Sequence, residues 1–225
     1  MRRVAIVTGA SRGIGRAIAK RLASNFEILA IARSQQPLEQ LAREIEKDGG
    51  KCRVAALDLA DADAVAAALR DVDADVLVNN AGVGPVQPML EISPADWHNM
   101  VDVNFNALYH TSRAVLPGMI KRKRGHIVII GSIAGRSAFV GGAGYSATKA
   151  AAMSFAENLM LEVREHGVKV SIVNPGSVAT EFSPKKDPSW MLTPDEVAES
   201  VARVIDTPSD VLIHRVEIRA LTPKK

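Results

Sequence analysis

Short apolar segments alternate with longer amphipathic segments along the chain. The apolar segments are candidate β-strands, because they are rich in Val and Ile and show little polar alternation, as is typical of strands covered by helices on both faces. They are Val4–Val7, Ile28–Ile31, Cys52–Ala56, Val76–Val78, His126–Ile130, Val168–Val173 and Val211–Ile218. The alternation predicts repeated βα units and an α/β fold with a doubly wound, mostly parallel sheet.

The segments between these strands carry helix-end signals. Residues 93–96 (Ser-Pro-Ala-Asp) and 193–196 (Thr-Pro-Asp-Glu) each place an N-cap and a first-turn proline at a helix start, with Glu196 at the capping-box position. The glycine pair at 49–50 ends a helix that begins near Pro37. A further helix is expected to start near Gly15.

No internal repeat or low-complexity segment interrupts the pattern, so we predict a single domain, 1–225. The polar, proline-bearing stretch 183–192 includes Trp190, which favours a substrate loop over a linker between domains. Lys185 and Lys186 in this stretch are interpreted as solvated, with attraction of an acidic substrate group as the alternative.

Composition narrows the class of protein. Hydrophobic residues make up 47% of the chain, yet no apolar run reaches the roughly 18 residues that span a bilayer, so no membrane partner is expected. Met1-Arg2-Arg3 starts like a signal peptide, but the apolar run that follows is too short, which favours a first strand. The single Cys52 excludes an internal disulfide, gives no hint of a metal site and agrees with a cytoplasmic protein.

Charge argues against nucleic acid as a partner, because a net charge of +3 is too small an excess, although it suits a phosphate-bearing ligand. The basic run 121–124 lies between a helical segment and a strand. We interpret it as a solvated connection; the alternative is a docking surface for an acidic partner.

A glycine-rich turn follows the first strand. Gly9, Gly13 and Gly15 stand in the segment Thr8–Gly15, where they permit a tight turn and let backbone N–H groups approach a pyrophosphate at a helix N-terminus. The spacing differs from the general G-x-G-x-x-G dinucleotide pattern. A purely structural turn is the alternative, which the position at the first strand-to-helix crossing disfavours.

The end of the second strand indicates which dinucleotide binds. NAD-binding proteins place a carboxylate there, whereas this chain has Arg33 followed by Ser34. Arg33 can pair with a 2′-phosphate, and Arg12 in the glycine turn can approach from the other side. NADP(H) is therefore the predicted cofactor, with two ordinary surface arginines as the alternative.

Tyr145 and Lys149 stand four residues apart, so on a helix they share one face. A lysine ammonium beside a phenol favours the phenolate, and we expect it to lower the tyrosine pKa from about 10 toward the working range. That suits a general acid/base acting on an alcohol or carbonyl oxygen. Ser132 follows the strand His126–Ile130, which places its hydroxyl at the carboxyl edge where ligand crevices lie.

Two more strands end in short polar or glycine-bearing segments that converge on the same edge, at 79–82 (Asn-Asn-Ala-Gly) and 174–176 (Asn-Pro-Gly). With the order and spacing of the preceding motifs, of Asp58-Leu59 and of Asn104, the chain resembles the short-chain dehydrogenase/reductase family, of the single-domain, NADP-preferring kind with a Rossmann-type fold. The resemblance extends over most of the chain.

The resemblance implies roles for residues that spacing alone leaves open. Tyr145 would be the acid/base, Lys149 would bind the nicotinamide ribose, Ser132 would polarise the carbonyl, and Asn104 would hold a water in a proton relay. Read as residues alone, Asn104 could equally be a helix-interior polar group, and Asp58 a helix cap. The expected cofactor-binding residues are Gly9, Ser11, Arg12, Gly13, Ile14, Gly15, Arg33, Ser34, Asp58, Leu59, Asn80, Ala81, Gly82, Tyr145, Lys149, Pro175, Gly176, Val178 and Thr180.

The implied function is NADP(H)-dependent interconversion of a carbonyl and a secondary alcohol, by a homodimer or homotetramer built on the helix that carries Tyr145. The stretch between Thr180 and Thr193 is short for the family, and the C-terminal sequence departs from that of ketoacyl-carrier-protein reductases, which favours carbonyl or hydroxy-acid substrates. Candidate pocket-lining residues are Val83, Phe139, Val140, Trp190 and Met191. The alternatives are a non-catalytic dinucleotide-binding redox sensor, or an epimerase or dehydratase, for which the chain lacks a second domain.

Overall fold

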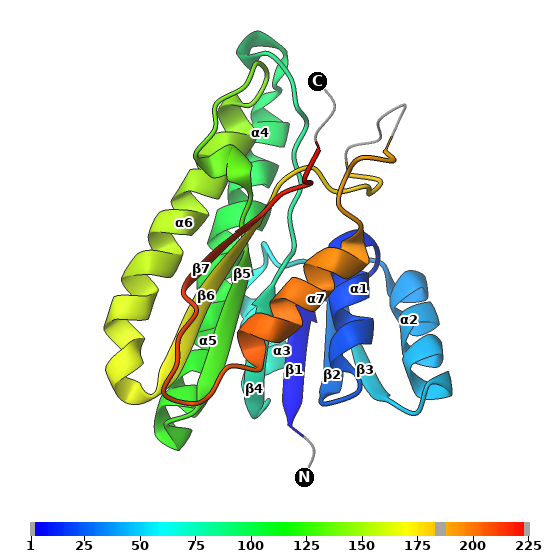
Figure 1. Ribbon diagram of the computed structural model, residues 1–225, viewed down its shortest axis with the longest axis vertical. Helices are drawn as coiled ribbons and strands as arrows, with labels where there is room; N and C mark the ends of the chain where they lie inside the picture. The colour runs from blue at the N-terminus through cyan, green and yellow to red at the C-terminus, as the bar shows by residue number, and fades with distance from the viewer. Residues whose placement is uncertain (1–2, 183–187, 223–225) are drawn as a thin grey trace.

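A single parallel sheet forms the frame that places the predicted site residues. The computed structural model describes residues 3–182 and 188–222 (Figure 1). The strands in this part of the chain are β1 (Val4–Thr8), β2 (Glu27–Ala32), β3 (Lys51–Ala56), β4 (Ala74–Asn79), β5 (Gly125–Ile130), β6 (Val168–Pro175) and β7 (Arg215–Ile218). Their order is β3-β2-β1-β4-β5-β6-β7, and every pair is parallel. The order changes direction between β1 and β4, so the predicted doubly wound α/β fold is confirmed.

Helices cover both faces of the sheet (Figure 1). One face packs against α1 (Gly13–Leu22), α2 (Gln35–Lys47) and α7 (Pro194–Ile205). The other packs against α3 (Ala62–Leu69), α5 (Ala107–Arg122) and α6 (Ala143–Val163). Helix α4 (Pro94–Val101) runs through a π-helical turn, η2 (Asp102–Asn106), into α5. Short 3₁₀ turns occur at η1 (Met89–Glu91), η3 (Ile133–Gly135) and η4 (Arg164–His166).

The two cores explain why the strands show so little polar alternation. In β1, Ala5 and Val7 belong to the core under α1, while Ile6 belongs to the core on the opposite face. All three are fully buried, so both faces of the strand require apolar side chains. This burial supplies the main driving force that fixes the sheet between its helix layers.

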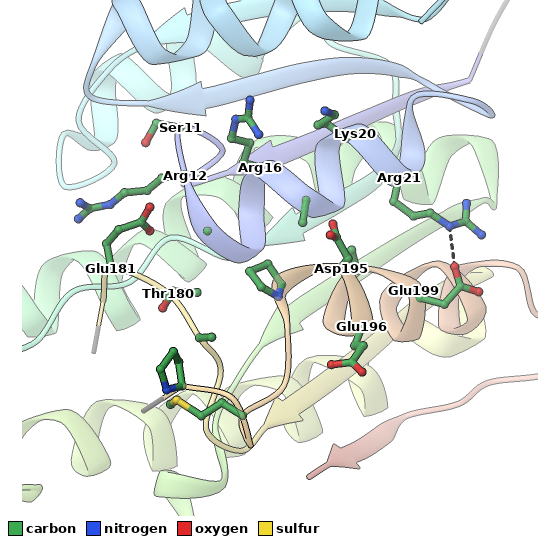
Figure 2. Close-up of a pocket in the computed structure, with 17 residues that line it drawn as sticks. Ser11, Arg12, Arg16, Lys20, Arg21, Thr180, Glu181, Asp195, Glu196 and Glu199 are labelled. Carbon is green, nitrogen blue, oxygen red and sulfur yellow. Dashed lines mark hydrogen bonds and ion pairs between the residues drawn. The ribbon is translucent and has the colours of Figure 1, made fainter. Parts of the chain in front are cut away.

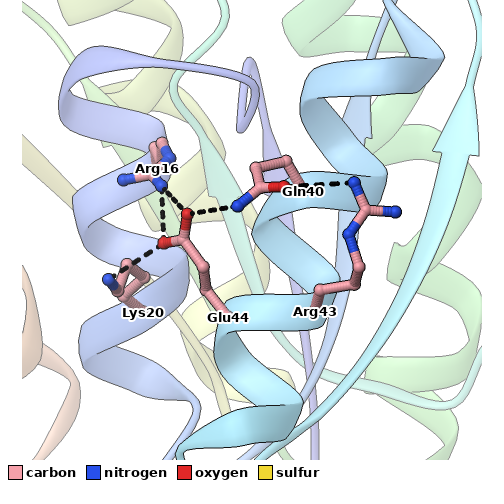
Figure 3. Close-up of polar contacts among 5 residues, drawn as sticks. All are labelled: Arg16, Lys20, Gln40, Arg43 and Glu44. Atoms are coloured by element: carbon pink, nitrogen blue, oxygen red, sulfur yellow. Dashed lines mark hydrogen bonds and ion pairs between the residues drawn. The ribbon is translucent and has the colours of Figure 1, made fainter.

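Ion pairs orient α1 against its two neighbouring helices. Arg16 contacts both carboxylate oxygens of Glu44 on α2, at 2.6 and 2.5 Å, and Lys20 contacts the same group at 3.1 Å (Figure 3). Hydrogen bonds from Gln40 and Lys20 are the main reasons that the pKa of Glu44 is lowered to about 2. On the other side, Arg21 pairs with Glu199 of α7 at 2.7 Å. Such exposed pairs contribute little stability each, so their main effect is to set the orientation of α1.

The start of the last strand differs from the prediction. The pattern predicts a strand over Val211–Ile218, but β7 begins only at Arg215. The carbonyl oxygens of Val211 and Ile213 accept hydrogen bonds from the side chains of Lys169 and Ser171 instead of from a neighbouring backbone. The strand-like apolar pattern of this segment is therefore held by hydrogen bonds from two polar side chains of β6, the partly exposed Lys169 and the buried Ser171.

Helix ends agree more closely with their sequence signals. Thr193 and Glu196 form the predicted capping box of α7, and Ser93 caps α4. Two helices begin two residues earlier than expected: α2 at Gln35 with Ser34 as N-cap, and α1 at Gly13. The first turn of α1 therefore lies inside the glycine-rich segment.

The basic run 121–124 is only partly a connection, because Lys121 and Arg122 belong to the last turn of α5, and it is not merely solvated. Arg122, the last residue of α5, pairs with Asp73 at 2.5 Å, and Arg124 pairs with Asp75 at 2.7 Å. Lys123 between them adopts a left-handed conformation that ends the helix. The two arginines thus fasten the end of α5 to the start of β4.

The capping box gives a direct test of how α7 is stabilised. The Thr193 hydroxyl accepts from the Glu196 N–H at 3.2 Å, and the Glu196 carboxylate accepts from the Thr193 N–H at 2.7 Å. We expect Thr193→Ala to lower the free energy of unfolding by about 1 kcal/mol, because the Glu196 N–H loses the hydroxyl that accepts its hydrogen bond. Urea unfolding measures this, with Thr193→Ser as the control that keeps the hydroxyl. Equal losses in the two variants would contradict the capping role.

Candidate active site

Thr8 and Asn80 join the ends of β1 and β4 at the point where the strand order changes direction. The Thr8 hydroxyl accepts hydrogen bonds from the N–H groups of Asn80 and Ala81, at 3.0 and 3.1 Å. The Asn80 side-chain amide donates to the carbonyl oxygens of Thr8 and Gly9, at 3.0 and 3.3 Å. The glycine turn and the segment after β4 are thus one hydrogen-bonded unit, as the convergence of strand ends predicts.

Close approach in this unit requires glycine. A Cβ on Gly15 would lie 2.4 Å from the Asn80 amide nitrogen and 2.4 Å from the Gly9 oxygen. Gly9 and Gly13 have φ angles of +64° and +54°, a region that residues with a Cβ rarely adopt. The first turn of α1 holds no acidic residue, and the Arg12 side chain makes no capping hydrogen bond. The N–H groups at this helix end are therefore available to an anion.

A second corner of the site lies at the ends of β2 and β3. The Ala10 N–H donates to the Ile31 oxygen at 3.1 Å, which brings the glycine turn to the end of β2, and Leu57 is joined in the same way to Ala32. Arg33 is the first residue after β2 and is exposed. Within residues 3–182 and 188–222, neither Arg33 nor Arg12 forms an ion pair.

Two residues near this corner were open in the sequence. Ser34 is the N-cap of α2, and its side chain makes no capping hydrogen bond. Asp58 is not the cap of α3; that position is taken by Asp61, whose carboxylate accepts from two N–H groups. The Asp58 carboxylate instead accepts from the Ala60 N–H at 3.0 Å. Leu59 is buried, and its carbonyl oxygen lies 3.0 Å from Nδ1 of His110.

The structure brings Tyr145 and Ser132 together as the spacing predicts. Ser132 follows β5 and caps η3, accepting from the Ala134 N–H at 3.1 Å, which leaves its own hydroxyl hydrogen free to donate. Burial raises the pKa of the Tyr145 phenol, and a hydrogen bond with Ser132 opposes that rise. The expected lowering of this pKa by Lys149 is not found, because burial outweighs the other influences of the protein's own groups.

Lys149 lies one helical turn beyond Tyr145 and is buried. Its ammonium donates to the Ile130 carbonyl oxygen at the end of β5, at 2.9 Å, and lies 5.8 Å from the centroid of the Tyr145 ring. Burial lowers the pKa of Lys149 to about 8. The site therefore holds a lysine that can exchange its proton near neutral pH.

Asn104 stands in the π-helical turn η2, and its side chain is fully engaged. Its oxygen accepts from the Val83 N–H at 2.7 Å, and its amide donates to the Val83 carbonyl at 2.7 Å and to the Thr148 hydroxyl at 3.0 Å. A Cβ on Gly82 would lie 3.5 Å from the Asn104 oxygen and 3.7 Å from the Lys149 nitrogen. Asn104 thus lies beside Lys149, and its side chain anchors the segment after β4 to α6.

The segment after β6 closes the other side of the site. Gly176 donates to the Ile218 oxygen at 2.8 Å, and Val178 pairs with Leu192 in an isolated bridge. Thr180 packs on the glycine turn, since its Cγ2 lies 3.4 Å from the position of a Cβ on Gly13. Phe182 contacts the Tyr145 ring, with centroids 5.5 Å apart.

The sequence interpretation missed three of these contacts. Thr8 was read only as part of the glycine motif, and Thr148 and Phe182 were not singled out. A hydroxyl residue at the very end of β1 is a signal that could have pointed to Thr8. Nothing in the local pattern points to Phe182, because its contact depends on the path of the chain after Thr180.

A cavity of about 1350 Å³ lies between α1 and α7 (Figure 2). It includes Ser11, Arg12 and Gly13 at one end, together with Thr180 and Met191, but none of Ser132, Tyr145 and Lys149. It therefore marks the approach to the glycine turn and not the acid/base cluster.

The predicted pocket wall is only partly supported. Met191 lines the cavity between α1 and α7, and Val83 is held by Asn104. Val140 is 93% exposed, so it forms no buried wall, because the segment before α6 projects from the body of the fold (Figure 1). Of the predicted loop 183–192, residues 183–187 lie outside the described residues, and with them Lys185 and Lys186.

The described residues hold neither a metal-binding cluster nor a membrane-spanning helix. In the described part of the chain, no group of three His, Cys, Asp or Glu side chains lies close enough together to bind a metal ion. None of the helices in residues 3–182 and 188–222 combines the length and apolar character needed to cross a membrane.

A glycine turn whose helix-end N–H groups are available to an anion, beside Ser132, Tyr145 and the buried Lys149 at the switch point of a doubly wound sheet, is the arrangement expected of a dinucleotide-dependent oxidoreductase. The family model described as short chain dehydrogenase matches residues 3–189. The chain belongs to this family, as the sequence motifs indicate.

Relatives with assigned activities match along nearly the whole chain. An NADP-dependent 3-hydroxy acid dehydrogenase of Salmonella typhi is 36% identical over 239 residues, covering 97% of this chain and 95% of that protein. A 3-oxoacyl-[acyl-carrier-protein] reductase of Escherichia coli is 32% identical and covers 80% of this chain and 75% of that protein.

Solved structures agree with the fold over the same extent. The closed form of a serine dehydrogenase complexed with NADP+ is 34% identical, with a TM-score of 0.91, covering 99% of this chain and 96% of that chain. A metagenomic short-chain oxidoreductase in complex with NADP is 38% identical, with a TM-score of 0.88 and 98% coverage of both chains.

The buried ammonium of Lys149 makes a stability prediction that needs no substrate. Its pKa is about 8 in the folded chain and 10.5 as the ordinary value, so between these pH values the unfolded chain binds more protons. The free energy of unfolding of the wild type, relative to Lys149→Met, should therefore rise by about 3 kcal/mol as the pH increases from 8 to 10.5. Urea unfolding at a series of pH values measures the difference, and a flat difference would rule out a buried charged lysine.

Proposed function

We propose that the protein is an NADP(H)-dependent oxidoreductase that interconverts a carbonyl and a secondary alcohol, with Tyr145 as the general acid/base. One observation carries this proposal: Ser132, which follows β5, and Tyr145 and Lys149 of α6 lie together at the carboxyl edge of the sheet beside the glycine turn. A structural turn alone would not require a buried lysine beside a half-buried tyrosine at the same edge.

The residues around the glycine turn fit the cofactor. The acid-free first turn of α1 suits a pyrophosphate. The guanidinium groups of Arg12 and Arg33, which form no ion pair within residues 3–182 and 188–222, suit a 2′-phosphate. Ser34 at the N-terminus of α2 adds a hydroxyl and helix-end N–H groups to the same corner. The Salmonella typhi relative is NADP-dependent, and the similar serine dehydrogenase and metagenomic oxidoreductase structures contain NADP+ and NADP.

The binding set that we propose follows the motifs. Residues at the pyrophosphate and 2′-phosphate are Gly9, Ser11, Arg12, Gly13, Ile14, Gly15, Arg33 and Ser34. Asp58, Leu59, Asn80, Ala81 and Gly82 lie toward the adenosine, and Pro175, Gly176, Val178 and Thr180 toward the nicotinamide, with Tyr145 and Lys149 at its ribose.

In the reductive direction, Ser132 and Tyr145 bind the substrate carbonyl oxygen. The bound cofactor supplies hydride to the carbonyl carbon. Tyr145 donates its proton to the oxygen as the charge develops, and its raised pKa keeps that proton in place beforehand. Lys149 stabilises the resulting phenolate and can return a proton, since its own pKa is about 8. Asn104 positions Gly82 and Val83 beside Lys149. In the oxidative direction the proton moves the other way.

For the substrate class we propose a small hydroxy acid or the corresponding oxo acid. The 3-hydroxy acid dehydrogenase of Salmonella typhi matches 97% of this chain at 36% identity, whereas the Escherichia coli acyl-carrier-protein reductase matches 80% of it at 32%. The short connection between Thr180 and Thr193 leaves little chain to build a long acyl channel.

We further propose that one domain acts as a subunit of a cytoplasmic homodimer or homotetramer built on α6. Support comes from the apolar side chains that α5 and α6 expose, since Tyr109 is 53% and Leu161 is 52% exposed. A single cysteine agrees with a reducing compartment.

The acid/base role predicts a large loss of turnover when the phenol oxygen of Tyr145 is removed. With NADPH and a panel of oxo acids, aldehydes and ketones, Tyr145→Phe should lower kcat by at least about 100-fold, because proton donation is lost while the ring remains. Stopped-assay rates of NADPH oxidation measure this. Tyr109→Phe, which removes the other tyrosine of the chain, is the matched control. Near-full turnover by Tyr145→Phe would refute the mechanism.

The 2′-phosphate role predicts an effect confined to one cofactor. Arg33→Ala should weaken NADPH binding roughly ten- to a hundredfold, because a charge-assisted hydrogen bond is lost, and should leave NADH binding nearly unchanged. Fluorescence titration with each cofactor measures the two constants. Arg43→Ala, an exposed arginine on α2, is the control. Equal weakening of NADH and NADPH would contradict the assignment.

A further inference from the structure

Phe182 is an aromatic residue that the catalytic scheme above does not use. Its ring centroid lies 5.5 Å from that of Tyr145, with an angle of 47° between the ring planes. Despite this contact the side chain is 41% exposed. A large apolar ring that contacts the proposed acid/base and still remains 41% exposed calls for an explanation beyond core packing.

The backbone that carries Phe182 is held against the glycine turn. The Thr180 side chain lies 3.4 Å from a Cβ position on Gly13, and one carboxylate oxygen of Glu181 lies 4.0 Å from the same position. Figure 2 shows Thr180 and Glu181 beside Ser11 and Arg12 at the start of α1. Residues 180–182 thus reach from the phosphate-binding turn to the phenol of Tyr145.

The other groups around Tyr145 are a glycine, a hydroxyl group and two ionisable side chains, so Phe182 differs from them in contributing a large apolar ring. From the segment after β4, Gly84 lies so close that a Cβ on it would be 3.0 Å from the tyrosine ring. From the segment after β5, Ser132 gives the phenol a hydrogen bond. From α6, Lys149 is the charged group, 5.8 Å from the ring centroid. From the segment after β6, the ionisable neighbour is Glu181, whose carboxylate is turned to Gly13.

We propose that Phe182 is a positioning residue for Tyr145: its ring keeps water from one side of the phenol, so that the proton stays on Tyr145 until a carbonyl compound displaces the remaining water. Burial is the dominant influence on Tyr145, and it raises the phenol pKa. Phe182 supplies an apolar part of that burial. The exposed side of the ring is then the surface against which the substrate packs. The packing of a carbonyl substrate against this ring, and the kinetic effects that follow from it, rest on the proposed function. The exclusion of water from the phenol does not.

The chain offers a clean spectroscopic test, because it contains two tyrosines. In a Tyr109→Phe background, biosynthetic 3-fluorotyrosine places one fluorine label, at position 145. The ¹⁹F chemical-shift difference between H₂O and D₂O reports water contact, and a pH titration of the same signal reports ionisation of the phenol. Neither measurement needs cofactor or substrate.

Phe182→Ala should increase the H₂O/D₂O shift difference and move the titration midpoint to lower pH, because the neutral phenol loses its apolar cover. Phe182→Leu, which keeps apolar bulk, should restore most of the wild-type behaviour. Phe139→Ala removes a ring of similar exposure, 43%, outside this contact and should move neither signal. Far-ultraviolet circular dichroism confirms that each variant is folded.

An unchanged label in Phe182→Ala, or an equal change in Phe139→Ala, would overturn the inference. In the NADPH assay, Phe182→Ala should also shift the alkaline limb of kcat to lower pH and raise KM. If the wild type reduces no carbonyl compound but Phe182→Ala still changes the label signals, the proposed function is refuted and the role of Phe182 stands. If the wild type is active but Phe182→Ala leaves the label signals unchanged, the proposed function stands and the role of Phe182 is refuted.

Discussion

The hydroxyl of Thr8 is the contact on which the rest of the site depends. It stands at the end of β1, accepts hydrogen bonds from two consecutive N–H groups after β4, and donates to the Val78 oxygen at 3.3 Å. At the switch point of a doubly wound sheet, neighbouring connections leave in opposite directions and open a crevice. Thr8 and Asn80 fix the width of that crevice, because they bond the two departing segments to each other. The glycines at 9 and 15 follow from this, since any side chain there would push Asn80 away.

Burial sets the electrostatics of the acid/base pair. It raises the pKa of Tyr145 and lowers that of Lys149, so each group alone is pushed toward its neutral form. A phenolate and an ammonium formed together stabilise each other in the same low-dielectric surroundings that penalise either one alone. The nearby ammonium therefore stabilises the phenolate once it forms, whereas burial is the main influence on the pKa of each group beforehand.

The sequence predicts the sheet, the helix caps and the convergence of strand ends because these depend on local patterns. The Val- and Ile-rich strands, the capping box at Thr193 and the spacing of Tyr145 and Lys149 all lie within short segments. Features that depend on the path of the chain are not predicted in this way. The pKa of Tyr145 depends on burial by segments far away in sequence, the Phe182 contact depends on the connection after β6, and the start of β7 depends on Lys169 and Ser171 reaching across from β6.

The π-helical turn at Asp102–Asn106 has a consequence for how the chain tolerates insertions and deletions. Such a turn is an α-helix with one extra residue, and each residue of an α-helix turns the following side chains by about 100°. A one-residue deletion between α4 and Asn104 would convert the turn into regular helix and rotate Asn104 away from Val83 and Thr148. The length of this turn is thus constrained as strictly as its residue types. Related chains that differ by one residue in this turn would have to rebuild the support of Lys149 from another element.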